Sequence, residues 1–448
     1  MLILKILLGL IGLGVVVFIH ELGHFLAARL VGIDVEAFSI GWGNPILKKK
    51  IGKVEYRLGM FPVGGYCKMK DESDYKAAWE NMRNGIKSEK GSYLASSPLS
   101  RIIVSFGGPF FNLLFAVILL SLIWGIGFEI NTLSNRIILA SDITEGQYPA
   151  DAAGLKTGDR IIEISGKNIS YYHEVQENIA LNPEKNLSVT VDRDGEIMRL
   201  SVTPSLDKST GAGKIGVYFW TDPVIGNIRE GSPAQLAGLL PGDRITAANG
   251  IPVRYSLDFM KAAEERSDTL LLEYERNGFK KQTEIKMPDY ENDPGFSWAS
   301  IHYRTPNLSV PGAIGKGIKE GYKTLVVSVK SLKLLFMGID LTQAVSGPMR
   351  ITYMMGDMAA QGFEQGLGIG LRSSVDFIAL ISIALCVMNL LPLPILDGGM
   401  IILFLVELIR RKPAHPKAIS IFQTCGMVII FGLMIFAVFG DIMYFVRR

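Results

Sequence analysis

Long apolar stretches alternate along the chain with polar segments of very different lengths. A helix needs about 20 mostly apolar residues to cross the hydrocarbon core of a bilayer. Four stretches meet that requirement, at residues 3–26, 102–127, 374–396 and 418–441. The last three have almost no charge in their middle, whereas the first contains His20, Glu21 and His24. The pattern therefore predicts four transmembrane helices, the first of which carries ionisable residues.

The charges between these spans predict which side of the membrane each connection faces. Four spans place both termini on one side, so the connections at about 30–101 and 397–417 share the other side. Both connections are rich in lysine and arginine, with clusters at 48–50 and 410–412. By the positive-inside bias they are cytoplasmic. The long segment 128–373 is then outside, which is the periplasm of a bacterium with two membranes, and we expect a multi-pass protein of the bacterial inner membrane.

The outside segment contains an internal repeat. Pro149–Ile161 is echoed by Pro233–Ile245, and Arg193-Asp194-Gly195 by Arg276-Asn277-Gly278. Each copy has the pattern of a short helix, a Gly-Asp turn, a strand, a second helix and a hairpin with an Asp-Gly or Asn-Gly turn. The repeat predicts two tandem copies of one small α+β domain, at residues 128–210 and 211–292.

Two shorter patterns predict elements outside the spans. Alternation of Val54, Tyr56 and Leu58 indicates a strand in the cytoplasmic loop 31–101. Lysines and apolar residues occupy opposite stripes of residues 313–340, which predicts an amphipathic helix. That helix either lies along the membrane surface or packs its apolar face on a soluble domain.

Charge and cysteine content exclude some functions. The net charge is only +3 over 448 residues and there is no long basic stripe, so nucleic-acid binding has little support. Cys67, Cys386 and Cys425 lack paired spacing. They therefore argue against a disulfide framework and against a thiolate metal site.

The ionisable residues of the first span form the motif His20-Glu21-Leu22-Gly23-His24. Histidines four apart on a helix project from the same face, so two neutral imidazoles can bind one Zn²⁺. Glu21 is then placed to take a proton from the water that the metal activates. Each ionisable side chain inside a span costs on the order of 2.5–3.5 kcal/mol, and metal binding offsets this cost. We therefore predict a zinc site with Glu21 as catalytic base.

Zinc requires a further protein ligand, for which Asp397 is the best candidate. It is the only acidic residue in Asn389–Gly399, where two prolines and two glycines interrupt the end of the third predicted span. Irregular backbone at membrane depth is tolerated mainly where it lines a buried or wet site. The first and third spans run in the same direction and each carries its motif at its cytoplasmic end, so the three ligands reach a similar depth. The other histidines lie outside the membrane (His173 and His302) or in a loop (His415).

These motifs and the order of the spans resemble the site-2-type intramembrane zinc metalloproteases, and among them the RseP-like regulators of sigma-E. The resemblance covers the whole chain. It implies that His20, His24 and Asp397 are zinc ligands, that Glu21 is the catalytic base, and that Asn389 holds the substrate backbone near the metal. It also implies that the two outside repeats are PDZ-like domains.

Other residues match the family in detail. Gly41-Trp42-Gly43 and Gly64-Gly65-Tyr66 resemble its membrane-associated β-hairpin, whose edge would hold an unwound substrate by strand addition. Ile215-Gly216-Val217 resembles the carboxylate-loop strand of PDZ domains, so the outside domains either bind peptides or exclude large substrates by size. Gly108-Pro109 and Asn112 also match a family motif. Trp42 stands where relatives often have Phe, and Met400 where they often have His.

The sequence therefore predicts a polytopic α-helical membrane protein with four transmembrane helices, a membrane-associated β-hairpin and two tandem periplasmic PDZ-like α+β domains. The expected helical segments, with their motifs, are 1–30, 102–127, 313–340, 374–398 and 418–441. The resemblance implies cleavage within the bilayer of single-pass membrane proteins, such as a pre-trimmed anti-sigma factor or signal-peptide remnants. The alternatives are a membrane-anchored zincin acting in protein quality control, which would need a third ligand shortly downstream of His24, and a non-catalytic PDZ scaffold, which would not depend on Glu21.

Overall fold

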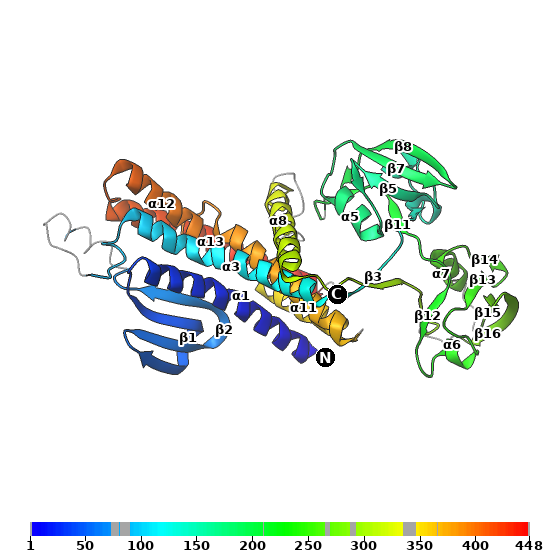
Figure 1. Ribbon diagram of the computed structural model, residues 1–448, viewed down its shortest axis with the longest axis horizontal. Coiled ribbons are helices and arrows are strands. Elements are labelled where there is room, and N and C mark those ends of the chain that lie inside the picture. The colour runs from blue at the N-terminus through cyan, green and yellow to red at the C-terminus, as the bar shows by residue number, and fades with distance from the viewer. Residues whose placement is uncertain are drawn as a thin grey trace. The chain divides into compact units, whose positions relative to one another are not determined.

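The computed structural model describes residues 2–72, 80, 90–208, 210–264, 269–286, 293–334, 346–364 and 366–446. The chain forms two units. Met1–Phe128 and Thr305–Arg448 make up the first, and Glu129–Arg304 the second. The first unit is built mainly from long helices and the second mainly from strands (Figure 1).

Among the described residues, four helices of the first unit are long and apolar enough to cross a membrane. They are α1 (Leu2–Leu30), α3 (Pro98–Ile126), α11 (Leu367–Asn389) and α13 (Pro416–Val446). The predicted number of spans is thus confirmed. The third helix lies earlier than expected, because Pro392 and Pro394 follow its end at Asn389 and cannot continue it. A separate helix, α12 (Asp397–Arg410), then begins at Asp397.

Helices α1 and α3 lie side by side (Figure 1) and touch through glycines. A Cβ atom at Gly23 would lie 2.3 Å from the carbonyl oxygen of Gly107, and one at Gly107 would lie 2.6 Å from that of Gly23. Only residues without a side chain permit so close an approach of two backbones. The contact occurs in the middle of the His20–His24 motif and brings α3 against both histidines.

A long antiparallel hairpin follows α1, formed by β1 (Val35–Ile51) and β2 (Val54–Met69). Near α1 it is buried, where Phe38 packs edge-on against Phe25. Its far end exposes large apolar side chains, including those of Ile46, Leu47 and Ile51. Register shifts interrupt the pairing throughout Val35–Leu47, and only Leu47–Ile51 pairs with Val54–Leu58 without a break. The predicted strand through Val54 and Leu58 is therefore one arm of this hairpin.

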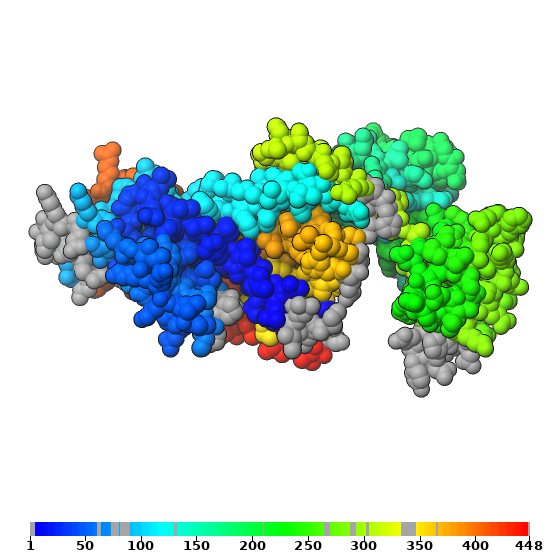
Figure 2. All heavy atoms as spheres, turned by 60° about the horizontal axis from the view of Figure 1, so that its bottom comes forward, coloured from blue at the N-terminus to red at the C-terminus, as the bar shows by residue number. Residues whose placement is uncertain are grey.

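Helix α8 (Val310–Leu334) covers the described part of the predicted amphipathic helix, and its expected end at 335–340 lies outside the described residues. It lies across α3, as the yellow-green and cyan surfaces in Figure 2 show. Its buried line is Ala313, Gly317 and Gly321, whereas Ile318 is 54% exposed. The packing face thus contains a row of small residues, which let α8 approach a neighbouring helix closely. Leu325 of the apolar stripe also packs there, against a core formed by α3 and α11.

Helix α10 (Pro348–Glu364) was not expected from the sequence. It packs against the first half of α1, where a Cβ at Gly9 would lie 2.0 Å from the carbonyl oxygen of Thr352. Lys5 of α1 forms an ion pair with Asp357 of α10 at 2.5 Å. The buried carboxylate of Asp441, in α13, accepts hydrogen bonds from backbone N–H groups at the start of α10. These contacts fix α10 between two of the spans.

Two four-stranded sheets of the second unit share one topology. Their strand orders are β6-β5-β7-β8 and β14-β13-β15-β16. The first sheet consists of β5 (Arg160–Ile164), β6 (Lys167–Asn168), β7 (Leu187–Arg193) and β8 (Glu196–Val202); its helices are α4 (Pro149–Ala152) and α5 (Tyr172–Ala180). The second consists of β13 (Arg244–Ala248), β14 (Ile251–Pro252), β15 (Thr269–Arg276) and β16 (Phe279–Lys286); its helices are α6 (Pro233–Leu236) and α7 (Ser256–Glu264). The sequence repeat is therefore a repeat of structure.

An equivalent ion pair explains the echoed Gly-Asp and Arg residues of the two copies. In the first copy, Nε and Nη2 of Arg193 donate to the two carboxylate oxygens of Asp159 at 2.7 and 2.8 Å. In the second, Arg276 donates to Asp243 at 2.7 Å through both nitrogens. Both aspartates are almost completely buried. The pair joins the Gly-Asp turn to the hairpin in each copy.

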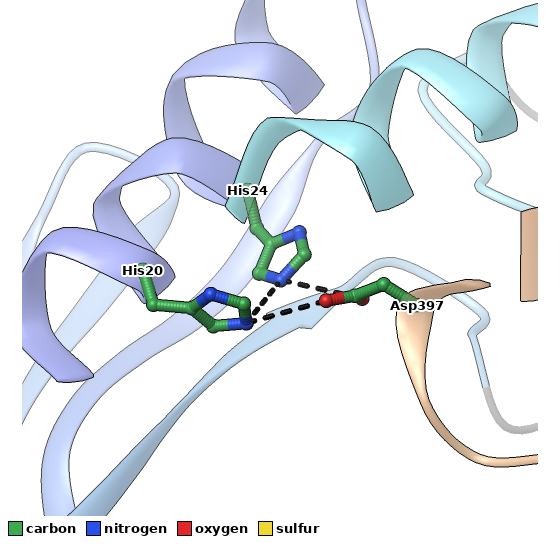
Figure 3. A group of neighbouring side chains, drawn as sticks. All are labelled: His20, His24 and Asp397. Carbon is green, nitrogen blue, oxygen red and sulfur yellow. Dashed lines mark hydrogen bonds and ion pairs between the residues drawn. The ribbon is translucent and has the colours of Figure 1, made fainter. Parts of the chain in front are cut away.

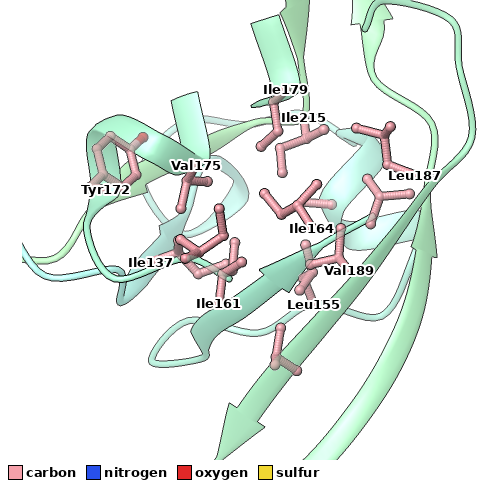
Figure 4. Close-up of a cluster of buried hydrophobic side chains, with 14 of the residues drawn as sticks. Ile137, Leu155, Ile161, Ile164, Tyr172, Val175, Ile179, Leu187, Val189 and Ile215 are labelled. Carbon is pink, nitrogen blue, oxygen red and sulfur yellow. The ribbon is translucent and has the colours of Figure 1, made fainter. Parts of the chain in front are cut away.

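Each copy has its own hydrophobic core. Figure 4 shows the first, in which Ile161 and Val189 of the sheet meet Val175 of α5 and also Ile215. The strand after Ile215, β11 (Val217–Phe219), pairs with β4 (Ile137–Leu139). The first domain therefore continues beyond the boundary expected at 210–211. Similarly, β12 (Ile225–Ile228) pairs with β17 (Phe296–Trp298), so the second domain extends beyond residue 292.

Short strands complete the second unit. Its first and last strands, β3 (Glu129–Thr132) and β18 (Ile301–Arg304), pair antiparallel. The strands β9 (Ser205–Leu206) and β10 (Gly213–Lys214) form a small hairpin, and a 3₁₀ turn follows β4 at Ala140–Asp142. The β3–β18 pair brings the entry and the exit of this unit together, as expected for an insertion between two spans.

Candidate metal centre

His20, His24 and Asp397 meet in the first unit, although the last two are 373 positions apart in the chain. The Nε2 atoms of the two histidines lie 3.2 Å apart. Asp397 places one carboxylate oxygen 3.3 Å from Nε2 of His20 and the other 3.5 Å from Nε2 of His24. Figure 3 shows all three side chains pointing toward one point. We call this group the His–His–Asp centre.

The hydrogen bonds around the His–His–Asp centre fit a divalent metal. Nδ1 of His24 lies 2.8 Å from the carbonyl oxygen of Val104, which can only accept, so this nitrogen carries the proton. In the neutral ring, the lone pair of Nε2 is then directed into the centre. Two ring nitrogens and a carboxylate converging at this distance form an electron-rich donor set that a cation balances. Nitrogen and oxygen donors with a position left for water are the ligands of catalytic zinc.

Helix α3 forms the wall behind the two histidines. A Cβ atom at Gly108 would lie 2.4 Å from Nε2 of His24 and 2.7 Å from Cε1 of His20. Val104, Gly108 and Asn112 are spaced four residues apart and so share one face of α3, which we call the orienting stripe. The sequence pointed to Gly108 and Asn112 only through the family resemblance, and it did not point to Val104. Polar or missing side chains at i, i+4 spacing in an apolar span are the signal that could have found this face.

Tight backbone turns place Asp397 at the start of α12. Residues 390–396 are not helical, and Ile395 has a φ of 78°. A Cβ at Gly398 would lie 2.2 Å from the carbonyl oxygen of Leu390, and one at Gly399 would lie 2.1 Å from that of Leu393. The two glycines therefore let the loop fold back onto α12 directly beside the carboxylate.

Glu21 lies beside β2 of the hairpin. Its carboxylate accepts a hydrogen bond from the backbone N–H of Cys67, and it interacts electrostatically with His24 and Asp397. A Cβ at Gly65 would lie 3.1 Å from Cγ of Glu21. The hairpin backbone thus passes next to the carboxylate predicted to act as base.

The other predicted substrate-binding residues lie at different distances from the centre. Nδ2 of Asn389, at the end of α11, is 3.4 Å from Nε2 of His20. Gly41, Gly43 and Gly64 have φ angles of 82°, 90° and 85° and form the irregular part of the hairpin. There the Trp42 ring packs against Tyr66, whose hydroxyl accepts a hydrogen bond from Arg57. Gly65, by contrast, lies directly beside Glu21.

Ile215, Gly216 and Val217 line a groove of about 570 Å³ in the first domain of the second unit. Ile215 is part of the core, and Gly216 has a φ of 78° with the Tyr148 ring against it. The carbonyl oxygen of Val217 accepts a hydrogen bond from the hydroxyl of Tyr172 on α5. Burial raises the pKa of this tyrosine to about 12. The strand and α5 thus form the two sides of the groove.

This chain is similar to known proteins over almost its whole length. The model of peptidase family M50 matches residues 8–433. A Treponema pallidum protein named "Putative zinc metalloprotease" is 35% identical over 445 residues, which cover 98% of this chain and 99% of that protein. A Borreliella burgdorferi protein of the same name is 31% identical, with 98% of each chain covered. The "Regulator of sigma E protease" of Haemophilus influenzae is 28% identical, with 96% of this chain and 97% of that protein covered.

Proposed function

The chain belongs to peptidase family M50 and is a membrane zinc metalloprotease of the site-2 type, and we propose that it cleaves single-pass membrane proteins within the bilayer. The observation that carries this proposal is the position of the His–His–Asp centre. Two of its members belong to the apolar span α1 and the third begins the helix that follows α11. A protease acting on soluble chains gains nothing from placing its ionisable residues in a span, at a cost of several kcal/mol.

We propose that His20, His24 and Asp397 hold the zinc. When bound, zinc makes water more acidic and polarises the peptide carbonyl that is attacked. Glu21 accepts the proton of the attacking water and passes it to the leaving amine. The hydrogen bond from the Cys67 backbone supports this role, because it fixes the carboxylate beside the centre. Asn389 is placed by its amide near His20 to hold the substrate backbone.

The hairpin offers a way to present an extended substrate. A helical substrate hides its carbonyls in backbone hydrogen bonds, so it must unwind locally before cleavage. In our proposal the unwound segment adds to an edge of the β1–β2 hairpin. The passage of β2 beside Glu21 supports this arrangement, since a strand paired there lies close to the base.

We further propose that the two repeated domains are PDZ-like, lie in the periplasm and select substrates. Their shared topology and the groove beside Ile215–Val217 support binding of an exposed chain end. A periplasmic position follows from the lysine and arginine clusters in the connections on the other side of the membrane. Substrates of this kind include an anti-sigma factor already trimmed on its outer side and remnant signal peptides. The Haemophilus influenzae relative named for sigma E favours the first.

Glu21→Gln tests the catalytic proposal. Co-expressed with a single-span reporter, this variant should lose cleavage by about 10²-fold or more, because a general base contributes that much. Its zinc content should stay at the wild-type level, since Glu21 is not a ligand. Glu36→Gln, which alters an exposed carboxylate paired with Lys68, is the matched control and should cleave normally. Undiminished cleavage of the reporter in cells that express Glu21→Gln would refute the assignment of the base and favour the non-catalytic scaffold.

Asp397→Ala tests the third ligand. Zinc measured in the purified variant should fall well below one ion per chain, and unchanged zinc would refute the assignment. The membrane-anchored zincin remains the alternative function. It predicts that the wild-type protein degrades an unfolded soluble protein while leaving the single-span reporter intact.

A further inference from the structure

Asn112 is a completely buried amide inside the span α3, and it faces His20. The amide nitrogen, Nδ2, lies 3.2 Å from Nδ1 of His20, which is the ring nitrogen turned away from the His–His–Asp centre. The corresponding nitrogen of His24 has a backbone partner on the same helix, the carbonyl oxygen of Val104. The two ends of the orienting stripe therefore each place a polar group against the outer ring nitrogen of one histidine.

The chemistry of the centre decides which atom of the amide faces His20. A ligating histidine uses an unprotonated nitrogen, so with Nε2 in the centre the proton of the neutral ring is on Nδ1. Nδ1–H needs an acceptor, and the amide supplies one only through its oxygen. A half-turn of the amide exchanges its oxygen and nitrogen, which have nearly the same shape. In the described part of the chain, the Asn112 oxygen has no hydrogen-bond partner in its present position, so this turn breaks no bond to it.

Asn112 is also fixed in place from the opposite side. Its backbone carbonyl accepts a hydrogen bond of 2.9 Å from the hydroxyl of Ser382 on α11. Both residues are completely buried. This bond joins α3 to the helix that ends at Asn389, so the amide is held at the depth of the centre by two spans.

We propose that Asn112 is a positioning residue that accepts the Nδ1–H of His20 through its side-chain oxygen and so turns Nε2 of His20 toward the metal. The inference rests on the proposed zinc ligands and deepens them. Partners of this kind fix the tautomer and the ring orientation of a ligating histidine, and their loss typically costs 10–100-fold in metal affinity.

Two substitutions that keep nearly the volume of Asn112 distinguish a hydrogen-bond acceptor from a side chain that only fills space. Asn112→Asp keeps an oxygen acceptor beside Nδ1, whereas Asn112→Leu keeps the volume and removes the acceptor. The zinc dissociation constant of each full-length variant is measured in detergent by competition with a chelator. We expect Asn112→Leu to bind zinc about 10–100-fold more weakly than the wild type. Asn112→Asp should stay close to the wild type, since a carboxylate accepts from a ligating histidine equally well.

Two further measurements distinguish orientation from general damage. Thermal unfolding of the metal-free proteins gives the stability of each variant, so that a loss of stability is measured separately from a loss of zinc affinity. The visible spectrum of the Co²⁺-loaded protein reports ligand geometry, and it should change in Asn112→Leu and be retained in Asn112→Asp.

Either of two results would overturn the proposal. Wild-type zinc affinity in Asn112→Leu would mean that the amide only fills space. Equal weakening in both variants would mean that Asn112 donates to His20 instead of accepting. A wild-type protein that binds no zinc at this centre would instead refute the ligand assignment itself, so the two failures are distinguishable.

Discussion

Replacing Gly108 by alanine should weaken zinc binding without weakening the helix that carries it. The added Cβ would lie 2.4 Å from Nε2 of His24, whereas ordinary contacts begin at 3.4 Å. The ring must therefore withdraw by about 1 Å to reach a normal van der Waals distance. Zinc sites keep ligand distances within about 0.2 Å of their preferred values, so the displaced ring no longer fits. We expect zinc affinity to fall by at least about 10-fold, as it does when the support of a ligand is lost.

The effect of this change on the helix has the opposite sign. Alanine in the interior of a helix is favoured over glycine by about 0.5–1 kcal/mol. A loss of stability of α3 therefore cannot explain a loss of zinc affinity. Gly125→Ala on the same helix is the matched control, because its nearest neighbour would be Cβ of Ala313 at 3.7 Å. Chelator competition on both purified variants gives the two affinities. Equal zinc binding by Gly108→Ala, Gly125→Ala and the wild type would refute the proposed role of the glycine.

Two other predictions concern buried polar groups. Glu407→Gln should destabilise the protein in detergent by about 3–5 kcal/mol, since it leaves the buried guanidinium of Arg101 without the carboxylate that it contacts at 2.6 Å. Lys53→Met, which removes an exposed ion pair, should cost less than about 1 kcal/mol, and equal thermal midpoints for the two variants would contradict this reasoning. Burial favours the neutral phenol of Tyr172 and raises its pKa to about 12, so its contribution to stability is complete below about pH 10 and is lost as pH rises from 10 through 12. In ultraviolet titrations, the difference between wild type and Tyr172→Phe should show a phenol ionising at about 12, and a midpoint near 10 would oppose it.

The sequence predicted the features that depend on local pattern. Apolar length identified the four spans, and the echo of Gly158-Asp159 in Gly242-Asp243 identified the repeat. The motif at His20–His24 and the polar break around Asp397 pointed to residues that the structure brings within ligand distance. These signals can be read from the sequence because a charged side chain inside a span is costly and therefore rare without a function.

The features that the sequence did not predict depend on which segments become neighbours in the fold. The sequence did not reveal that α8 packs through Ala313, Gly317 and Gly321, because small residues at every fourth position do not identify a packing face until the partner helix is known. Helix α10 was missed because its apolar pattern is too short for a span. The boundary after residue 210 was placed too early, since the strand that closes the first domain follows a loop and pairs with Ile137–Leu139 far upstream.

The contacts of α3 suggest why a metal centre divided between distant segments is assembled reliably. Val104 and Asn112 contact the outer nitrogens of the two histidines, and Gly108 leaves room for both rings. One turn earlier on α3, Arg101 binds Glu407 of α12, the helix whose first residue is Asp397. All three proposed ligands are therefore positioned by contacts with α3, although none of them lies on that helix. Because a zinc site tolerates only small displacements, a single rigid reference is a more accurate way to align ligands than contacts made separately by each segment.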